Sequence, residues 1–313
     1  MNEPKTLMQA IKYFSDQDVC LDFVVKLRWP NGVTCPTCGS QDVRFISTRR
    51  MWECKGKHAK RQFSVKVGTI FEDSAIGLDK WLAAIWMIAN AKNGVSSYEV
   101  ARALGITQKS AWFMMHRIRL AMDIESNQFS GTVEVDETFV GGKARFMHKD
   151  KRDRLTGTGG ADKTAVMGLL QRRVDAKSQV QTKVVENVRR YTLASEVRQR
   201  VATGSEIFTD ALKSYNDLSQ DYVHQVIDHA TNYAKGQVHT NGIENFWSLL
   251  KRAIKGTYVN VEPCHLAQYV DEEAFRFNNR DVDDADRFQF VVNGITGKRL
   301  TYNQLIGAST TPA

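Results

Sequence analysis

The stretch TVEVDETFVGG, residues 132–142, marks the point at which the chain changes from helical to strand-like patterning. Apolar and polar side chains alternate along it, which is the period of a strand with one buried face, and two glycines supply the turn that ends it. The alternation puts Glu134 and Asp136 on one face of the strand and Glu137 on the other. A sheet-containing domain is therefore predicted to begin here.

The sequence that follows switches repeatedly between strand-like and helical patterns. Strand-like patterns cover residues 164–170, 180–185, 206–209 and 222–227, and helical patterns cover residues 192–201, 241–254 and 263–277. Strands interleaved with helices indicate a mixed α/β domain. We place this domain at residues 132–290 and assign residues 291–313 to a C-terminal tail.

Three of the five cysteines lie close together near the N-terminus. The pattern is Cys35-Pro-Thr-Cys38, fifteen intervening residues, and Cys54-Lys-Gly-Lys-His58. Two ligand pairs on separate turns can wrap one tetrahedral Zn²⁺ through three thiolates and one imidazole. Because four protein ligands leave no open position for water, the zinc is predicted to be structural. We assign residues 1–76 to a zinc ribbon with a helical lead-in.

Residues 77–125 are predicted to be helical and to contain a helix-turn-helix. Ser96 and Glu99 have the spacing of a capping box at the start of one helix, and Gly105 turns the chain before a second helix begins at Gln108. Polar residues crowd the N-terminal turn of that second helix, where a recognition helix reaches base edges. The alternative is a plain αα-hairpin in a helical domain. The candidate DNA contacts are Gln108, Lys109, Ser110 and Arg117.

The charge of the chain is concentrated in its first part. Residues 1–125 carry 18 Lys and Arg against 12 Asp and Glu, a balance of +6, whereas residues 126–313 carry 25 against 23. Between Arg44 and Lys66 there are eight basic residues and one acidic residue, Glu53. A basic front end suits the neutralisation of nucleic-acid phosphates. The alternative is an ordinary solvated basic surface.

Three acidic residues of the second part have a spacing that suits metal-dependent phosphoryl transfer. Asp136 lies on the first predicted strand, Asp210 follows a later strand, and Glu244 lies on a predicted helix 34 positions further on. Together such carboxylates can hold two Mg²⁺ or Mn²⁺ ions that activate a hydroxyl nucleophile and stabilise the leaving oxygen. Lys251 lies two helical turns after Glu244 and can grip a substrate phosphate, although a solvated basic face is the alternative.

Composition excludes several classes of protein. Hydrophobic residues make up 42% and charged residues 25% of the 313 residues, which is ordinary globular usage. The longest strongly apolar stretch, residues 81–91, is too short to cross a bilayer. The N-terminal residues MNEPKTLMQA lack the pattern of a signal peptide. We therefore expect a cytoplasmic protein with no membrane partner and with reduced cysteines.

At this point the sequence resembles a known family. It is similar to bacterial insertion-sequence transposases of the ISXO type, which have an N-terminal zinc ribbon and an RNase H-like catalytic domain with an acidic triad. The resemblance covers about residues 15–280. The segments that carry it are CPTCGS (35–40), RQFSVKVGTIFEDS (61–74), LDKW (78–81), QKSAWFMMHRIR (108–119), VDETFVGGK (135–143), FTDALKSY (208–215) and HTNGIENFWSLLKR (239–252).

The resemblance implies both a fold and an activity. Asp136 and Asp210 match the first two metal-binding acids of the family. The family varies the third position between Glu and Asn, and this sequence offers Asn241 and Glu244. We favour Glu244, because it precedes Lys251 by seven residues. The implied partners are DNA, as terminal inverted repeats and as target, and further copies of the chain assembled on that DNA.

Three functions agree with these patterns. The first is a transposase that cleaves element ends and transfers the free 3′-hydroxyl into target DNA. The second is a DNA-binding regulator whose RNase H-like domain is inert. The presence of acidic residues at all three catalytic positions argues against this second function. The third is a nuclease with the same chemistry but without strand transfer, which only a joining assay separates from the first.

Overall fold

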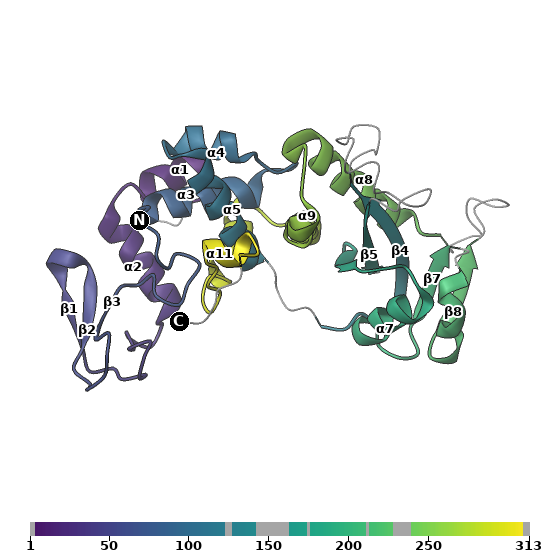
Figure 1. Cartoon of the computed structure of the whole chain (residues 1–313), viewed down its shortest axis with the longest axis horizontal. Helices are drawn as coiled ribbons and strands as arrows, with labels where there is room; N and C mark the ends of the chain where they lie inside the picture. The colour runs from purple at the N-terminus through teal and green to yellow at the C-terminus, as the bar shows by residue number, and fades with distance from the viewer. Residues whose placement is uncertain are drawn as a thin grey trace. The chain divides into compact units, whose positions relative to one another are not determined.

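The computed structural model describes residues 4–122, 127–141, 163–173, 176–210, 213–227 and 239–308. The chain forms two compact units (Figure 1), one made of residues 1–124 and 282–313 and the other of residues 125–281. Helices and two β-sheets are both present, in agreement with the predicted α/β class. Among the described residues, every helix is too short or too polar to span a lipid bilayer.

The first unit is mainly helical. Its helices are α1 (Leu7–Tyr13), α2 (Gln17–Arg28), α3 (Leu78–Asn90), α4 (Ser97–Leu104), α5 (Gln108–Met122), α10 (Asp284–Asn293) and α11 (Tyr302–Leu305). Helix α3 is apolar on nearly every side, and Trp81, Ile85 and Ile88 on it are almost fully buried. A helix of this kind needs partners all round, and α1, α2, α4, α5 and α10 pack against it.

Helices α4 and α5 form the predicted pair with a short turn between them. The Ser96 hydroxyl accepts the Glu99 N–H at 3.2 Å, and the Glu99 carboxylate accepts the Ser96 N–H at 2.8 Å, so both bonds of the capping box are present. Gly105 takes the left-handed conformation that ends α4, with φ of 60°. The Thr107 hydroxyl then accepts the Ser110 N–H at the start of α5.

The C-terminal segment belongs to this first unit, which differs from the predicted boundaries at residues 290 and 291. The N–H of Ile70 donates to the carbonyl of Ile295 at 3.0 Å, and the Lys298 ammonium donates to the carbonyl of Leu120 at 2.8 Å. In addition, the Asn90 amide donates to the carbonyl of Asp284 at 3.1 Å. Helix α10 therefore completes the core around α3, a contact between residues almost two hundred positions apart.

The zinc-ribbon region of the first unit is a small antiparallel sheet of order β1-β2-β3. The side chains of Trp52 and Phe63 are buried between the strands and a neighbouring aromatic residue, Trp29. Arg28 donates to the carbonyl of Val65 at 2.6 Å and stacks on the Trp29 ring, which ties the ribbon to α2. Its elements are β1 (Val43–Ile46), the short 3-10 helix η1 (Ser47–Arg49), β2 (Met51–Cys54) and β3 (Gln62–Phe63).

The second unit is built on a five-stranded sheet of order β6-β5-β4-β7-β8. Strands β4, β5 and β6 pair antiparallel, whereas β4 pairs with β7, and β7 with β8, in parallel. The elements of this unit are β4 (Thr132–Val140), β5 (Thr164–Gln171), β6 (Gln179–Val185), α7 (Arg190–Arg200), β7 (Glu206–Asp210), η3 (Lys213–Gln220), β8 (Val223–Ile227), α8 (Asn241–Ala253), the π-helical turn η4 (Ile254–Tyr258), η5 (Pro263–His265) and α9 (Leu266–Asn278).

Each face of this sheet is covered by helices, and strand alternation decides which residues meet them. Val133 and Val135 of β4 belong to the core cluster that includes Leu193 and Val197 of α7. The core cluster on the other face joins β5 and β6 to α8 and α9. Since Glu134 and Asp136 alternate with the two valines, they lie on the α8 face. The strand pattern thus directs these two carboxylates toward α8.

Candidate functional site

The structure brings all four predicted zinc ligands together in the ribbon. The ligand atoms of Cys35, Cys38, Cys54 and His58 lie within 4.8 Å of one another. The sulfur atoms of Cys38 and Cys54 are 3.6 Å apart, and Cys35 Sγ is 3.5 Å from His58 Nε2. Zinc–sulfur bonds near 2.3 Å in a tetrahedron give edges of about 3.8 Å. The four side chains therefore fit a structural Zn²⁺.

The surroundings of the ligands favour the same assignment. His58 Nδ1 donates to the carbonyl of Ala59 at 2.6 Å, so the proton lies on Nδ1 and the Nε2 lone pair faces the cysteines. The N–H of Gly56 donates to Cys54 Sγ at 3.3 Å. Burial raises the pKa of the Cys35 thiol, but hydrogen bonds from the backbone of Cys38 and Thr37 and from the side chains of Cys38 and Cys54 together lower it to about 6. A thiolate is the form that binds metal.

The two predicted aspartates meet at neighbouring positions on parallel strands. Strand β4 pairs with β7 in a register that ends with Val135 opposite Thr209. Asp136 and Asp210 are the next residues on each strand, and Asp210 is the last residue of β7. Since side chains at equivalent positions of adjacent strands lie on the same face, both carboxylates are directed to one side of the sheet.

Glu244 lies close enough to these aspartates to interact with them electrostatically. Burial raises the pKa of Asp136 to about 6, and the charges of Asp210 and Glu244 add to the rise, while hydrogen bonds from Trp247 and from the backbone of Glu137 oppose it. The Thr240 hydroxyl donates to a Glu244 carboxylate oxygen at 3.0 Å. Carboxylate oxygens are the ligands that Mg²⁺ and Mn²⁺ prefer, so these three acids stay the candidate ligands of the predicted divalent-metal site.

The other two residues predicted on α8 are more exposed. Asn241, the alternative third ligand, is the first residue of the helix and its side chain is exposed, whereas Glu244 is half-buried. Lys251 lies in the last turn of α8 and is exposed, as a residue that grips a substrate phosphate needs to be. The preference for Glu244 over Asn241 as the third ligand stays a prediction.

Two further carboxylates of β4, those of Glu137 and Glu134, flank Asp136 in the sequence. Burial raises the pKa of Glu137 to about 8, with contributions from Asp136 and Asp210. Glu134 is 1% exposed and forms an ion pair with Arg172 at 2.6 Å. Glu134 and Glu137 were noted in the sequence only as neighbours of Asp136, and no sequence pattern predicted their burial or the pairing of Glu134 with Arg172.

The predicted DNA contacts on α5 have different surroundings. Lys109 is exposed, and its ammonium lies 4.7 Å from the centre of the Tyr302 ring. The Gln108 amide donates to the Ser97 hydroxyl at 2.8 Å, and the Ser110 hydroxyl accepts from Thr107 at 2.9 Å. All three residues lie on the first turn of α5, where they were expected, although two of them are engaged within the unit.

Arg117 is a correction to the predicted set. Its side chain is 3% exposed, donates to the carbonyl of Glu72, and lies over the rings of Trp81 and Phe113. A guanidinium held in this way packs the interior of the unit and is not presented to DNA. Its position three residues after Met114 places it beside the apolar face of α5, and the aromatic neighbours complete its burial.

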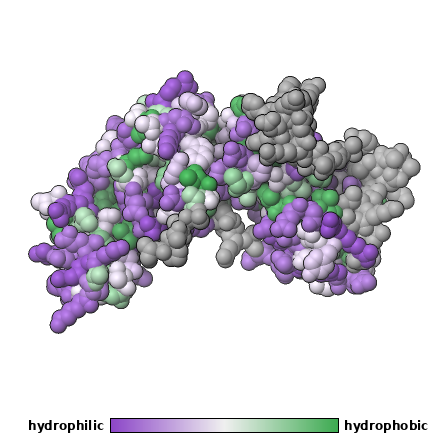
Figure 2. Space-filling model, viewed as in Figure 1, coloured by the Kyte–Doolittle hydropathy of each residue, from purple (hydrophilic) through white to green (hydrophobic). Residues whose placement is uncertain are grey.

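Most of the basic residues of the ribbon are at the surface. In Figure 2, hydrophilic residues predominate over the β1–β3 end of the first unit. Some of their charge is balanced locally, since Arg44 pairs with Glu53 and Arg50 with Asp18. Lys66 is turned inward, and its ammonium donates to the carbonyls of Ser74 and Ile76. Arg61 is exposed too, but it lies 3.9 Å from the Glu53 carboxylate and donates to the carbonyl of Cys54 at 2.9 Å. The other exposed basic residues include Arg49, Lys57 and Lys60.

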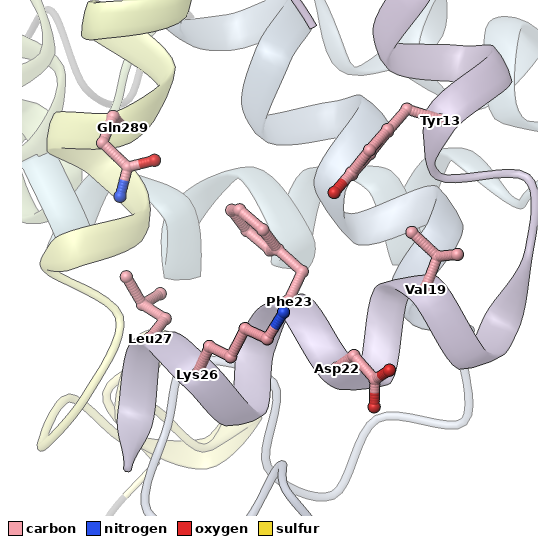
Figure 3. A pocket seen from close by; sticks show the side chains of 7 residues that line it. All are labelled: Tyr13, Val19, Asp22, Phe23, Lys26, Leu27 and Gln289. Carbon is pink, nitrogen blue, oxygen red and sulfur yellow. The ribbon is translucent and has the colours of Figure 1, made fainter. Parts of the chain in front are cut away.

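A hollow in the first unit shares no lining residue with either candidate site. It is bounded by α1, α2 and α10 and is lined by residues such as Tyr13, Phe23, Leu27 and Gln289 (Figure 3). None of the zinc ligands, acidic residues or predicted DNA contacts lines it. We therefore assign no part of the chemistry to this hollow.

Comparisons with known proteins place both parts of the chain in transposase families. Residues 128–278 match the family model of the ISXO2-like transposase domain, and residues 15–56 match that of the transposase zinc-ribbon domain. A Halobacterium salinarum protein, described as an uncharacterized protein in transposable element ISH50, is 28% identical over 256 residues, which are 78% of this chain and 85% of that protein. An uncharacterized transposase-like protein of Haemophilus influenzae is 35% identical over 107 residues, which are 34% of this chain and 86% of that protein.

Proposed function

This chain belongs to the ISXO2-like transposases, and on that basis we propose that it binds insertion-sequence ends and catalyses metal-dependent strand cleavage and strand transfer. The observation that carries the proposal is the meeting of Asp136 and Asp210 on adjacent parallel strands, with Glu244 close to them. The order of three antiparallel and two parallel strands supports an RNase H-like domain as its scaffold.

The three acids have distinct parts in the proposed chemistry. Asp136, Asp210 and Glu244 would hold Mg²⁺ or Mn²⁺, which when bound activates the attacking hydroxyl and stabilises the leaving oxygen of an in-line displacement. Lys251, exposed on the same helix, would bind a phosphate of the DNA. Catalysis would then depend on positioning and on electrostatic stabilisation.

The first unit would supply DNA binding. The zinc ribbon would contact phosphates through exposed basic residues such as Arg49 and Arg61. Helix α5 would read base edges from its first turn as the second helix of a helix-turn-helix, with Lys109 as the exposed contact. Cleavage and joining involve two element ends and a target, so we include assembly of several copies of the chain on DNA in the proposal.

One experiment tests the reaction directly. Full-length protein is incubated with Mg²⁺ and labelled DNA ends that flank its gene, and cleaved and joined products are separated. Asp136→Asn and Asp210→Asn are expected to abolish both products while end binding persists. The control is Asp281→Asn, which removes an exposed carboxylate of the same unit that pairs with Lys177 and which is expected to leave both products at the wild-type level.

The outcomes separate the competing functions. Cleaved ends without joined products indicate a nuclease. End binding without either product, in wild-type protein with Mg²⁺ or Mn²⁺, indicates a regulator with an inert domain. Cleavage that survives in both aspartate variants contradicts the assignment of the acidic site.

A further inference from the structure

Helix α8 contacts the acidic strand β4 at two points. The N–H of Ile243 donates to Glu134 Oε2 at 2.9 Å, and the indole N–H of Trp247 donates to Asp136 Oδ2 at 2.9 Å. Four residues of a helix rise about 6 Å, and two residues of a strand advance about 6.6 Å. Because the two spacings match, both hydrogen bonds form together when α8 runs along β4. The pair of contacts fixes the register of the helix on the strand.

Two glycines make this close approach possible. Gly168 on β5 lies opposite Asp136, and a Cβ at this position would lie 2.6 Å from the Trp247 ring and 2.8 Å from Ile243 Cδ1. A Cβ on Gly242 would lie 2.9 Å from Glu134 Oε2. Any larger residue at position 168 would therefore push the indole away from Asp136. The glycine and the tryptophan act as one structural feature although they lie on different elements.

The two carboxylates of β4 have different hydrogen-bond donors and therefore different roles. Glu134 has its oxygens engaged by Arg172 and by the Ile243 N–H, so it anchors the start of α8. Asp136 accepts the Trp247 N–H on Oδ2 and a hydrogen bond from the backbone of Glu137. A carboxylate has about four acceptor sites, so Asp136 can still bind a ligand beside these two hydrogen bonds. An indole N–H is a donor only and cannot itself bind a cation.

We propose that Trp247 is a positioning residue of the acidic site: its indole N–H orients the Asp136 carboxylate and, together with the Glu134 contact, sets the register of α8 that places Glu244. This inference rests on the proposed function, because it concerns the metal that Asp136 would hold. Hydrogen-bond partners of metal ligands commonly contribute 10–100-fold to metal affinity or activity, so the effect is measurable.

The test measures Mn²⁺ binding to full-length protein without DNA, by the paramagnetic resonance signal of free Mn²⁺. Trp247→Phe keeps an aromatic ring and removes the N–H, and it is expected to raise the half-saturating Mn²⁺ concentration by about tenfold or more. The control is Phe246→Leu, which alters a buried neighbour on the same helix that has no polar atom to reach Asp136. This control is expected to bind Mn²⁺ as wild type does.

A second pair of variants reaches the same contact without changing Trp247. Gly168→Ala is expected to weaken Mn²⁺ binding because its Cβ displaces the indole, whereas Gly256→Ala, where a Cβ meets open space, is expected to leave binding unchanged. This pair decides the question if Trp247→Phe does not fold, as judged by circular dichroism. Excess Mn²⁺ is expected to restore the maximal cleavage rate of Trp247→Phe, since a positioning role acts on metal affinity.

Failure of the inference differs from failure of the proposed function. If Asp136→Asn loses Mn²⁺ binding but Trp247→Phe and Gly168→Ala bind as wild type does, Trp247 has no positioning role and the metal site stands. Equal losses in Trp247→Phe and Phe246→Leu would show that packing alone matters and would also overturn the inference. If Asp136→Asn itself binds Mn²⁺ like wild type, the proposed metal site is wrong.

Discussion

The anchor at the start of α8 gives a prediction whose magnitude follows from the structure. Glu134 is 1% exposed and accepts two hydrogen bonds, from Arg172 at 2.6 Å and from the Ile243 N–H at 2.9 Å. Glu134→Ala removes both and leaves the Arg172 guanidinium without its carboxylate. Breaking a buried ion pair in this way costs about 3–5 kcal/mol. Glu134→Gln keeps an oxygen for the Ile243 N–H and loses the charge pairing, worth about 1.5–3 kcal/mol.

These energies convert into rates of local opening of α8, measured by amide hydrogen exchange of peptides from residues 241–253. At 1.4 kcal/mol per factor of ten, exchange should accelerate about 10- to 150-fold in Glu134→Gln and by more than about 150-fold in Glu134→Ala. The control is Glu186→Ala, an exposed carboxylate directly after β6, which should leave α8 unchanged. If α8 in Glu134→Ala exchanges its amide hydrogens at the wild-type rate, Glu134 does not anchor the helix. If the Ala and Gln variants accelerate exchange equally, the separate energies assigned to the ion pair and to the hydrogen bond are wrong.

Three further predictions address the zinc site, the DNA interface and the third metal ligand. In native zinc-loaded protein, a thiol reagent should modify exposed Cys264 first, and a chelator should then make the three ribbon cysteines reactive. Cys20 should react only on unfolding, because burial raises its pKa to about 12. Rapid modification of Cys20 in native protein would contradict this prediction. Lys109→Ala should weaken binding to element ends by about 1–3 kcal/mol more than it weakens binding to random DNA. Arg49→Ala should weaken binding to both DNAs and reduce the salt dependence of binding. If the two variants behave identically in binding titrations, α5 is not the helix that reads the base sequence. Glu244→Gln should abolish end cleavage while Asn241→Ala retains it, and the reverse result on the same labelled ends would make Asn241 the third ligand.

The elements around the acidic site could be predicted closely from sequence because their signals are local. Alternation over residues 132–139 predicted a strand that the structure has as β4, Thr132–Val140, and the pattern at residues 206–209 corresponds to β7, Glu206–Asp210. The capping box at Ser96 was likewise readable, since its two hydrogen bonds join residues three positions apart. In each case the residues that decide the element lie within one short window.

The features that could not be predicted depend on contacts between distant segments. The chain reaches α10 only after the whole second unit, yet α10 packs on α3, and no local pattern signals that return. Arg117 has the composition of a DNA contact, but Trp81, thirty-six positions upstream, covers its guanidinium. A single sequence gives the charge of a side chain, whereas its exposure is decided by the partners that the fold brings to it.

The same reasoning explains why Trp247 and Glu134 were missed as parts of the site. In the sequence, Trp247 reads as one apolar residue of an amphipathic helix, and its ring does pack in the core between α8 and the sheet. However, a buried indole N–H requires an acceptor, and on this face of β4 the Asp136 carboxylate lies within reach of it. A useful pattern is therefore a tryptophan one helical turn after a candidate metal-binding acid, with a glycine on the strand that the tryptophan crosses. In this arrangement the core residue that buries the helix would also orient the carboxylate that the proposed chemistry needs.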